Sequence, residues 1–331
     1  MDEREALALL DGELAPAGDD AAVVDGLVLT TDMLHETTDF PPGTTRYTAG
    51  WRTVAASLSD VAAMGAVPTA AVAVYAAPSF EADELLAFVR GAADVCASVG
   101  ASYVGGDLDH HDEFTAVSTV VGRTDAAEAT GRVVTRSGAR PGDLVGVSGA
   151  LGRTAAAIAL FESGKHESDE SASDESASGE SESSERASDA IDRANDLFRF
   201  SPRVETGLAL APHATAMMDS SDGLARSLHQ LAEASGCGFS IEGDRIPIAD
   251  ALTAVGANGD DRSGPPTGGE SLLETAITVG EDFELVFTIP ESKLEAARAA
   301  APIELSIVGR VTEDGITLDG APLADTGYDH G

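Results

Sequence analysis

The chain is poor in lysine and cysteine, and it has no long apolar run. Lys165 and Lys293 are its only lysines, so the other 18 of its 20 basic residues are arginines. Its two cysteines, Cys96 and Cys237, lie far apart without a C-x-x-C pattern, which indicates neither a disulfide framework nor a zinc site. No stretch approaches the roughly 18 apolar residues that a membrane helix needs. The acidic start MDEREALALL is unlike a secretory signal. These absences predict a cytoplasmic protein.

Positive charge is scarce overall. Twenty basic residues stand against 57 acidic ones, for a net charge of −37. This charge excludes binding to a nucleic acid backbone by electrostatic attraction. An acidic, lysine-poor surface suits a salt-rich cytoplasm, where ions screen self-repulsion, and it predicts a halophilic source. On such a protein a lone Asp or Glu is most often solvated surface, so only a pattern of acids indicates a site.

At 331 residues, 43% of them hydrophobic, the chain is long enough for about two globular domains. Strands and helices alternate in both halves, and we expect two mixed α/β domains, 1–137 and 138–331. In the first, strands are expected at 27–31, 69–76, 102–104 and 115–122, and helices at 48–64 and 81–99, the latter with Ser79 as N-cap. In the second, helices are expected near 152–161, 202–210 and 222–234, and strands at 214–219 and around Phe239, Ile277, Leu285 and Ile307.

Two segments stand apart from this alternation. Residues 163–189 hold ten serines and nine acids and no large apolar residue. They cannot bury enough surface to offset the entropy of ordering, so we expect a disordered acidic insert. Residues 256–270, rich in Gly, Asp and Pro, are expected to form a surface loop.

Aspartates repeatedly stand where apolar runs begin or end. They are Asp19 and Asp20 in GDDAAV, Asp32 in LTTDM, Asp60 at the end of a helix, Asp107 in YVGGD, and Asp219 and Asp222 in AMMDSSDG. Any one of them is more often a cap or a solvated charge, but the repetition favours a shared site. Converging carboxylates repel one another unless a cation lies between them. Because Mg²⁺ takes one or two carboxylates plus phosphate oxygens, the array predicts several Mg²⁺ ions on a polyphosphate if it converges.

Three further features could meet phosphate. Gly105 and Gly106 allow close approach of backbone amides to an oxyanion, although a plain tight turn is as common. Ser220 or Ser221 is expected to cap a helix whose N-terminus favours anions, or to be an ordinary cap. Arg136 is the best-placed arginine, with a structural role at the domain joint as the alternative. No P-loop or protein-kinase motif occurs.

Two other polar clusters carry less information. Glu281 and Asp282 in VGEDFELVF are expected in a turn between two strands, and His110 and His111 in an exposed loop. No pairing of a nucleophile with a base stands out. We therefore expect no covalent enzyme intermediate.

Taken in order, the segments resemble the thiamine-monophosphate kinase family, within the aminoimidazole-ribonucleotide-synthetase-like superfamily. The matching segments are GDDAAV, TTDML, SLSDVAAMGAVP, GGD, GRVVTRSGARPGD, SPR, MDSSDGL, GEDFEL and GYDH, which span nearly the whole chain except the acidic insert. The resemblance implies an enzyme that uses ATP as co-substrate to convert thiamine monophosphate to thiamine diphosphate. It also implies a homodimer whose N-terminal sheets pair across the axis, with nucleotide in a cleft.

The resemblance assigns residues to roles. Those expected to hold Mg²⁺ are Asp20, Thr30, Thr31, Asp32, Asp60, Asp107, Asp219 and Asp222. Those expected at ATP are Gly106, Asp107, Arg136 and Ser221, and those at the thiamine substrate are Asp39, Glu281 and Tyr328. Asp39 stands where the family commonly has His before Phe, and the tail GYDHG lacks a final aromatic, so substrate contacts depart from the family pattern.

The implied mechanism is direct in-line phosphoryl transfer. Metal ions and Arg136 would neutralise the phosphates, and an acceptor that is already an anion needs no general base. Two alternatives stay open. One is another ATP-dependent superfamily member, similar to aminoimidazole ribonucleotide synthetase. The other is a non-catalytic divalent-cation or nucleotide-binding protein.

Overall fold

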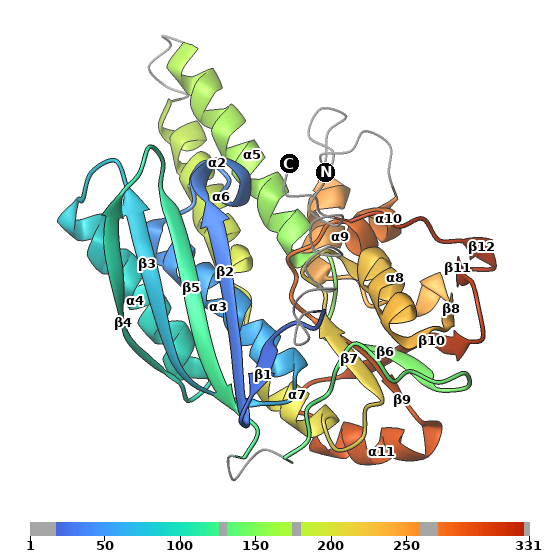
Figure 1. The fold of residues 1–331 in the computed structure, drawn as a ribbon. Helices are drawn as coiled ribbons and strands as arrows, with labels where there is room; N and C mark the ends of the chain where they lie inside the picture. The colour runs from blue at the N-terminus through green and yellow to red at the C-terminus, as the bar shows by residue number, and fades with distance from the viewer. Residues whose placement is uncertain (1–17, 126–130, 174–179, 259–270, 328–331) are drawn as a thin grey trace.

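The computed structural model describes residues 18–125, 131–173, 180–258 and 271–327. It contains two mixed α/β halves, each built on one sheet (Figure 1). The expected fold class is therefore confirmed. Strands of the first sheet end at Arg123, and those of the second begin at Leu144. No helix in the described ranges is long and apolar enough to cross a membrane.

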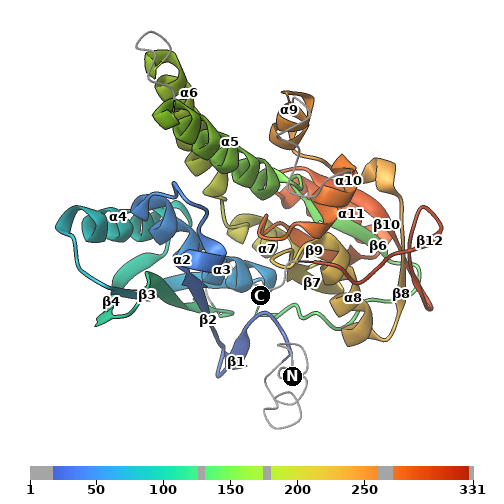
Figure 2. The ribbon, with the colours of Figure 1, turned by 90° about the horizontal axis from the view of Figure 1, so that it is seen from above.

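The first half holds a five-stranded sheet in the order β1-β2-β5-β3-β4. Its elements are β1 Ala22–Val24, β2 Leu27–His35, α2 Glu36–Asp39, α3 Arg46–Ala63, β3 Val67–Ala77, α4 Ala82–Ser98, β4 Ser102–His110 and β5 Thr115–Arg123. Helices α3 and α4 cover one face of the sheet (Figure 2). In β2, Val28, Thr30 and Leu34 are buried while Leu29, Thr31 and Met33 are exposed, as strand alternation requires. The other face of the sheet is therefore open.

Two glycines let α3 and α4 cross closely. A Cβ at Gly50 would lie 2.1 Å from the Phe88 carbonyl oxygen, and one at Gly91 would lie 2.0 Å from the Tyr47 carbonyl oxygen. Any side chain at either position would push the helices apart. The close crossing fixes α3, the helix that carries Asp60, against the rest of the first half.

The second half holds a seven-stranded sheet in the order β12-β11-β8-β10-β6-β9-β7. Its strands are β6 Leu144–Ser148, β7 Ala216–Asp219, β8 Gly238–Ile241, β9 Leu285–Ile289, β10 Leu305–Thr312, β11 Ile316–Leu318 and β12 Ala321–Pro322. Its helices are α5 Arg153–Ser173, α6 Glu180–Phe198, α7 Val204–Leu210, α8 Leu224–Ser235, the 3₁₀ turn η1 Gly243–Arg245, α9 Asp250–Asn258, α10 Leu272–Thr278 and α11 Glu291–Ala300. Alternate residues of β9 enter two different apolar cores, Val286 with α8 and Phe287 with α7 and α11, because helices cover both faces.

A third apolar core joins the two halves. It combines Leu58 of α3 and Tyr75 of β3 with Phe161 of α5, Phe198 of α6 and Phe283. The first half therefore packs directly on α5, α6 and the segment before β9. This packing fixes the position of Asp60 relative to β7.

Several local expectations were wrong. The strand expected at 27–31 continues to residue 35, so Asp32 lies inside β2 rather than after it. Glu81, not Ser79, stands at the N-cap of α4. Ile277 lies in a helix, α10, whose N-cap Ser271 accepts a hydrogen bond from the Glu274 amide. The strand expected at 102–104 continues to residue 110, so Asp107 lies inside β4 rather than after it. The last concerns the cap of α8, described with the site.

The acidic insert also differs from expectation. Residues 163–173 continue α5 and residues 180–189 belong to α6, and the two helices run side by side away from the body (Figure 1). At the base of the two helices, the ring of Phe161 packs edge-on against that of Phe198. This apolar contact helps α5 and α6 pair, and the polar composition of residues 163–189 gave no sign of it. Residues 174–179 lie outside the described residues, as does most of the expected loop, since 256–258 end α9.

Candidate functional site

Three of the predicted aspartates meet at the joint between the halves. Asp20 precedes β1, Asp60 lies near the end of α3, and Asp219 ends β7. One carboxylate oxygen of each lies within 4.8 Å of the others. We call these residues the acid trio. They come from three segments that only the fold brings together, as the sequence pattern predicted.

Burial and mutual repulsion disfavour the ionised forms of Asp60 and Asp219. The pKa of Asp60 is raised well above its usual value, first by burial and then by the charges of Asp32, Asp219 and Asp20. The pKa of Asp219 is raised from 3.8 to about 7, again by burial and then by Asp20. Without a bound cation, Asp60 and Asp219 therefore hold protons over a pH range in which carboxyl groups in water are ionised.

The trio fits a hard divalent cation. All three ligands are carboxylate oxygens, the donor type that Mg²⁺ prefers. In the part of the chain that the structure describes, the second oxygens of Asp20 and Asp219 are buried and accept no hydrogen bond. Buried polar atoms normally have partners, so these two oxygens fit a role as ligands of a cation.

Hydroxyl groups of β2 and α3 orient the acids around the trio. Thr30 Oγ1 donates to Asp60 Oδ2 at 2.5 Å, and Ser57 Oγ donates to Asp32 Oδ2 at 2.5 Å. The buried small residues on this side of α3 allow the sheet to approach closely. Asp32 therefore stands beside the trio on the same face of the sheet as Thr30.

Arg136 closes the trio on one side. Its Nη2 donates to Asp20 Oδ1 at 2.9 Å, and its backbone amide donates to Asp19 Oδ1 at 2.7 Å. Burial alone would lower the pKa of Arg136, but the nearby acids outweigh burial and raise it. The arginine is thus both part of the domain joint and next to the predicted phosphate region, so the two readings of the sequence are compatible.

A cleft of about 650 Å³ lies next to the trio and reaches it at Asp60. We call it the acidic cleft. The polar side chains along it include Asp32, Asp39, Asp60, Ser221, Asp222 and Glu281. Asp222 is held by Gln230, whose Nε2 donates to its Oδ2 at 3.1 Å, and it stands outside the trio.

The expected serine cap of α8 is wrong. The N-cap is Gly223, with no side-chain cap. A tight turn in which the Gly223 amide donates to the Ser220 carbonyl occupies the place of the cap. Ser220 Oγ instead accepts from the Glu284 amide, and the Ser221 amide donates to Asp219 Oδ1 at 3.2 Å. Ser221 therefore lines the cleft and binds Asp219 through its backbone amide, but it does not cap the helix.

Three predicted residues are not brought to the trio within one chain. Thr31 alternates with Thr30 and Asp32, so its hydroxyl lies on the open face, where it donates to the Ser118 carbonyl. Gly106 pairs with Ala73, which pairs with Ser118, which pairs with Asp32, so Gly106 lies three strands, about 14 Å, from Asp32. Asp107, the next residue of β4, points to the open face of the sheet.

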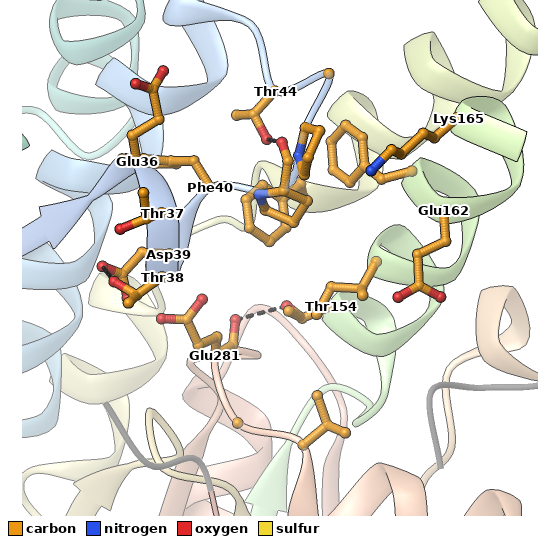
Figure 3. Close-up of a pocket in the computed structure, with 18 of the residues that line it drawn as sticks. Glu36, Thr37, Thr38, Asp39, Phe40, Thr44, Thr154, Glu162, Lys165 and Glu281 are labelled. Atoms are coloured by element: carbon orange, nitrogen blue, oxygen red, sulfur yellow. Dashed lines mark hydrogen bonds between the residues drawn. The ribbon is translucent and has the colours of Figure 1, made fainter. Parts of the chain in front are cut away.

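A second pocket, of about 730 Å³, adjoins the acidic cleft. We call it the aromatic pocket because Phe40, Phe161 and Phe198 line it together with Pro41 and Pro42. Figure 3 shows Thr38, Asp39 and Glu281 on one wall and Glu162 and Lys165 of α5 across from them. Thr38, Asp39 and Glu281 line both spaces and so form their junction.

At that junction, Asp39 is held by hydrogen bonds from neighbouring residues. It is buried, and its Oδ2 accepts from the His35 amide at 2.7 Å and from Thr38 Oγ1 at 2.8 Å. These bonds stabilise the single turn of α2. Tyr328, the third predicted substrate residue, lies outside the described residues.

Sequence reasoning placed Glu281 and Asp282 in a turn but missed how this turn is held. Asp282 caps α5, accepting from the amides of Gly152 and Thr154, and burial raises its pKa to about 6 against these bonds. Glu284 is buried and accepts two hydrogen bonds from Arg203. The run of three acids in GEDFEL was the available signal, since three carboxylates so close together need partners.

Comparisons with known proteins cover the whole site. Residues 18–124 match the family described as AIR synthase related protein, N-terminal domain, and residues 140–319 match its C-terminal domain. The chain is 55% identical to a thiamine-monophosphate kinase of Halobacterium salinarum, over 100% of both chains. It is 36% identical to one of Methanospirillum hungatei, covering 100% of this chain and 99% of the relative. A solved structure described as AaThiL complexed with AMPPCP and TMP superposes with a TM-score of 0.80 at 26% identity, over 100% of this chain and 97% of that one.

Proposed function

The chain belongs to the AIR synthase related family and, within it, to the thiamine-monophosphate kinases, and on that premise we propose how its residues divide the reaction. Its function is the phosphorylation of thiamine monophosphate by ATP, a phosphotransferase reaction. The observation that carries the proposal is the acid trio at the edge of the acidic cleft, with the aromatic pocket adjoining that cleft.

We assign the donor side to the trio and its neighbours. Asp20, Asp60 and Asp219, with Asp32 beside them, hold Mg²⁺, which when bound neutralises the charge on the phosphates of ATP. Thr30 and Ser57 fix the carboxylates of Asp60 and Asp32 through their hydrogen bonds. Arg136 adds positive charge, and Ser221 and Asp222 line the path of the nucleotide's phosphates along the cleft.

The acceptor side is the aromatic pocket. Thiamine monophosphate combines aromatic rings, a positive charge and a phosphate, and the pocket combines phenylalanines with the acids Glu36 and Glu162 and the bases Arg46 and Lys165. Rings seated among the phenylalanines leave the phosphate directed at the junction with the acidic cleft. Asp39 and Glu281 then flank the acceptor phosphate or the ring next to it. Tyr328 stays a candidate for stacking on the substrate.

Transfer is direct and in line. The acceptor oxygen already carries negative charge, so the chain needs to hold two phosphates close together rather than remove a proton. Its task is positioning and charge neutralisation. No side chain becomes covalently modified.

Gly106 and Asp107 act from a partner subunit. The open face of the first sheet exposes Leu29, Met33 and Val72 at 44%, 55% and 39%, an unusual amount of apolar surface for a chain with this charge. A homodimer that pairs these faces covers that surface. It also carries Asp107, which shares the open face, toward the nucleotide of the partner.

Turnover tests the function. Purified protein is incubated with ATP, Mg²⁺ and thiamine monophosphate. The buffer contains molar KCl, because a net charge of −37 and the proposed salt-rich cytoplasm call for high salt. Thiamine diphosphate is expected, and its formation should cease in EDTA. Asp32→Asn and Asp60→Asn should each lower kcat by about 100-fold or more, in the range that single electrostatic groups of active sites supply. Asp125→Asn, at an exposed pair with Arg123, is the control. Metal binding without product would favour the non-catalytic binding protein.

Mixed dimers test the shared site. If Asp107 serves the partner's trio, a dimer of one Asp60→Asn chain and one Asp107→Asn chain contains one intact site. Random exchange of the two inactive variants should then restore about a quarter of the wild-type activity. A monomer by light scattering, or no recovery after exchange, refutes the shared site without affecting the kinase assignment.

A further inference from the structure

Arg52 is a buried arginine whose partners lie in the other half of the chain. It is 2% exposed, in the middle of α3. Its Nη1 donates to the carbonyl of Phe198 at 2.7 Å, and its Nη2 donates to Glu281 Oε2 at 2.5 Å. The guanidinium lies 3.6 Å from the centre of the Phe198 ring. A fully buried cation with this set of partners is held in one orientation.

Its carboxylate partner has a constrained backbone. Glu281 has φ +67°, in the left-handed region that non-glycine residues seldom occupy. The Glu281 amide donates to the Ser221 carbonyl at 2.6 Å, and Thr154 Oγ1 donates to the Glu281 carbonyl at 2.7 Å (Figure 3). Such strain persists where surrounding contacts impose it, and it concentrates at functional sites.

Glu281 also lies where charge matters most for an anionic acceptor. It lines both the aromatic pocket and the acidic cleft, at the junction that the acceptor phosphate must reach. A carboxylate left unpaired there would repel the phosphate. Arg52 provides the matching positive charge from behind, out of reach of solvent.

The same helix links this junction to the trio. Asp60 follows Arg52 by eight residues, which is about 12 Å along α3. Helix α3 therefore keeps the acid trio, on the ATP side, at a fixed distance from the junction, on the acceptor side. The Arg52–Glu281 pair extends that control to the turn before β9.

We propose that Arg52 is a positioning residue for the acceptor: it fixes Glu281 at the junction and cancels the charge that would otherwise oppose the entry of thiamine monophosphate. The proposal rests on the function proposed above. It assigns Arg52 an effect on the acceptor and none on ATP. Arg52 itself touches neither reactant.

Calorimetric titration with thiamine monophosphate, together with KM for each substrate, tests this role. Arg52→Gln should weaken acceptor binding by about tenfold or more, because removing one partner leaves a buried charge unpaired, while KM for ATP stays within about twofold. Adding Glu281→Gln to Arg52→Gln should raise the acceptor affinity back to that of Glu281→Gln alone, since no unpaired carboxylate is left. Arg52→Lys, which keeps the charge but loses the planar fork, should fall between Arg52→Gln and wild type.

Arg203→Gln is the matched control. Arg203, which is less buried than Arg52, pairs with Glu284 of the same turn, yet neither residue lines the aromatic pocket or the acidic cleft. It should lower Tm without changing acceptor affinity. The proposal fails if Arg52→Gln behaves like Arg203→Gln, or if the double variant binds the acceptor no better than Arg52→Gln.

Two further experimental outcomes also have a defined meaning for the role of Arg52. If Arg52→Gln does not fold, Arg52→Lys decides, and wild-type acceptor affinity in that variant overturns the proposal. If the wild type binds the acceptor but forms no product, the function proposed above fails while the binding comparison still tests Arg52.

Discussion

Replacing Asp219 with asparagine is expected to stabilise the metal-free protein above neutral pH. Burial, and then the charge of Asp20, raises the pKa of Asp219 from 3.8 to about 7. Between these values the folded chain holds a proton that the unfolded chain has released. The free energy of unfolding therefore falls as pH rises from about 4 to about 7, and the loss is complete above the folded pKa.

The size of the effect follows from the shift. About three pKa units at about 1.4 kcal/mol each give at most about 4 kcal/mol of destabilisation from this one carboxylate at pH 8. Asparagine has no proton to lose and places an amide beside two carboxylates. The variant should therefore match the wild type near pH 4 and exceed it by up to that amount at pH 8.

Urea unfolding in EDTA at fixed high KCl, from pH 4 to pH 8, measures this difference. Mg²⁺ should narrow the difference at pH 8, because an ion at 100 times its Kd stabilises the wild type by about 2.7 kcal/mol and the variant much less. Asp125→Asn is the control, since that exposed carboxyl has a pKa lowered by its hydrogen bond from Arg123. A wild-type minus variant difference that does not change with pH would refute the reasoning.

Three other substitutions test the packing around the site. Glu284→Gln leaves the partly buried Arg203 without its carboxylate partner and should lower the free energy of unfolding by about 1.5–3 kcal/mol, measured by urea titration. Phe200→Ala removes a ring stacked 4.1 Å from that of Phe283 and should cost about 3–5 kcal/mol in the same assay, whereas Phe200→Leu should cost less. Gly106→Ala would place a Cβ 1.7 Å from a carbonyl oxygen of β3, so hydrogen exchange along β4 should accelerate; unchanged protection would contradict the strand pairing.

Much of the site could be predicted because its residue types are informative by themselves. Asp20 and Asp219 stand just before β1 and at the end of β7, and elements that pack together bring such ends together. Asp32 and Asp60 lie within β2 and α3, which pack on each other. The alternation of strand-like and helix-like hydrophobic patterns predicted two mixed α/β halves, and the structure confirms this fold class. In these cases local pattern and tertiary structure agree.

The misses have a different physical origin. Arg52 is one polar residue in a buried helix, and its partner is 229 positions away, so nothing local indicates the pair. Ile277 lies in an apolar stretch too short to separate helix from strand, and the cap at Ser271 decides for the helix. Asp107 shows the limit of the rule about strand ends, because β4 continues past it and turns its side chain to the open face.

The distribution of the trio over both halves has a thermodynamic consequence. Asp20 and Asp60 belong to the first half and Asp219 to the second, so neither half alone contains all three ligands of the proposed cation site. Filling that site and docking the halves are therefore one linked equilibrium. Magnesium availability should set the stiffness of the joint, and chelation should loosen it before either sheet melts.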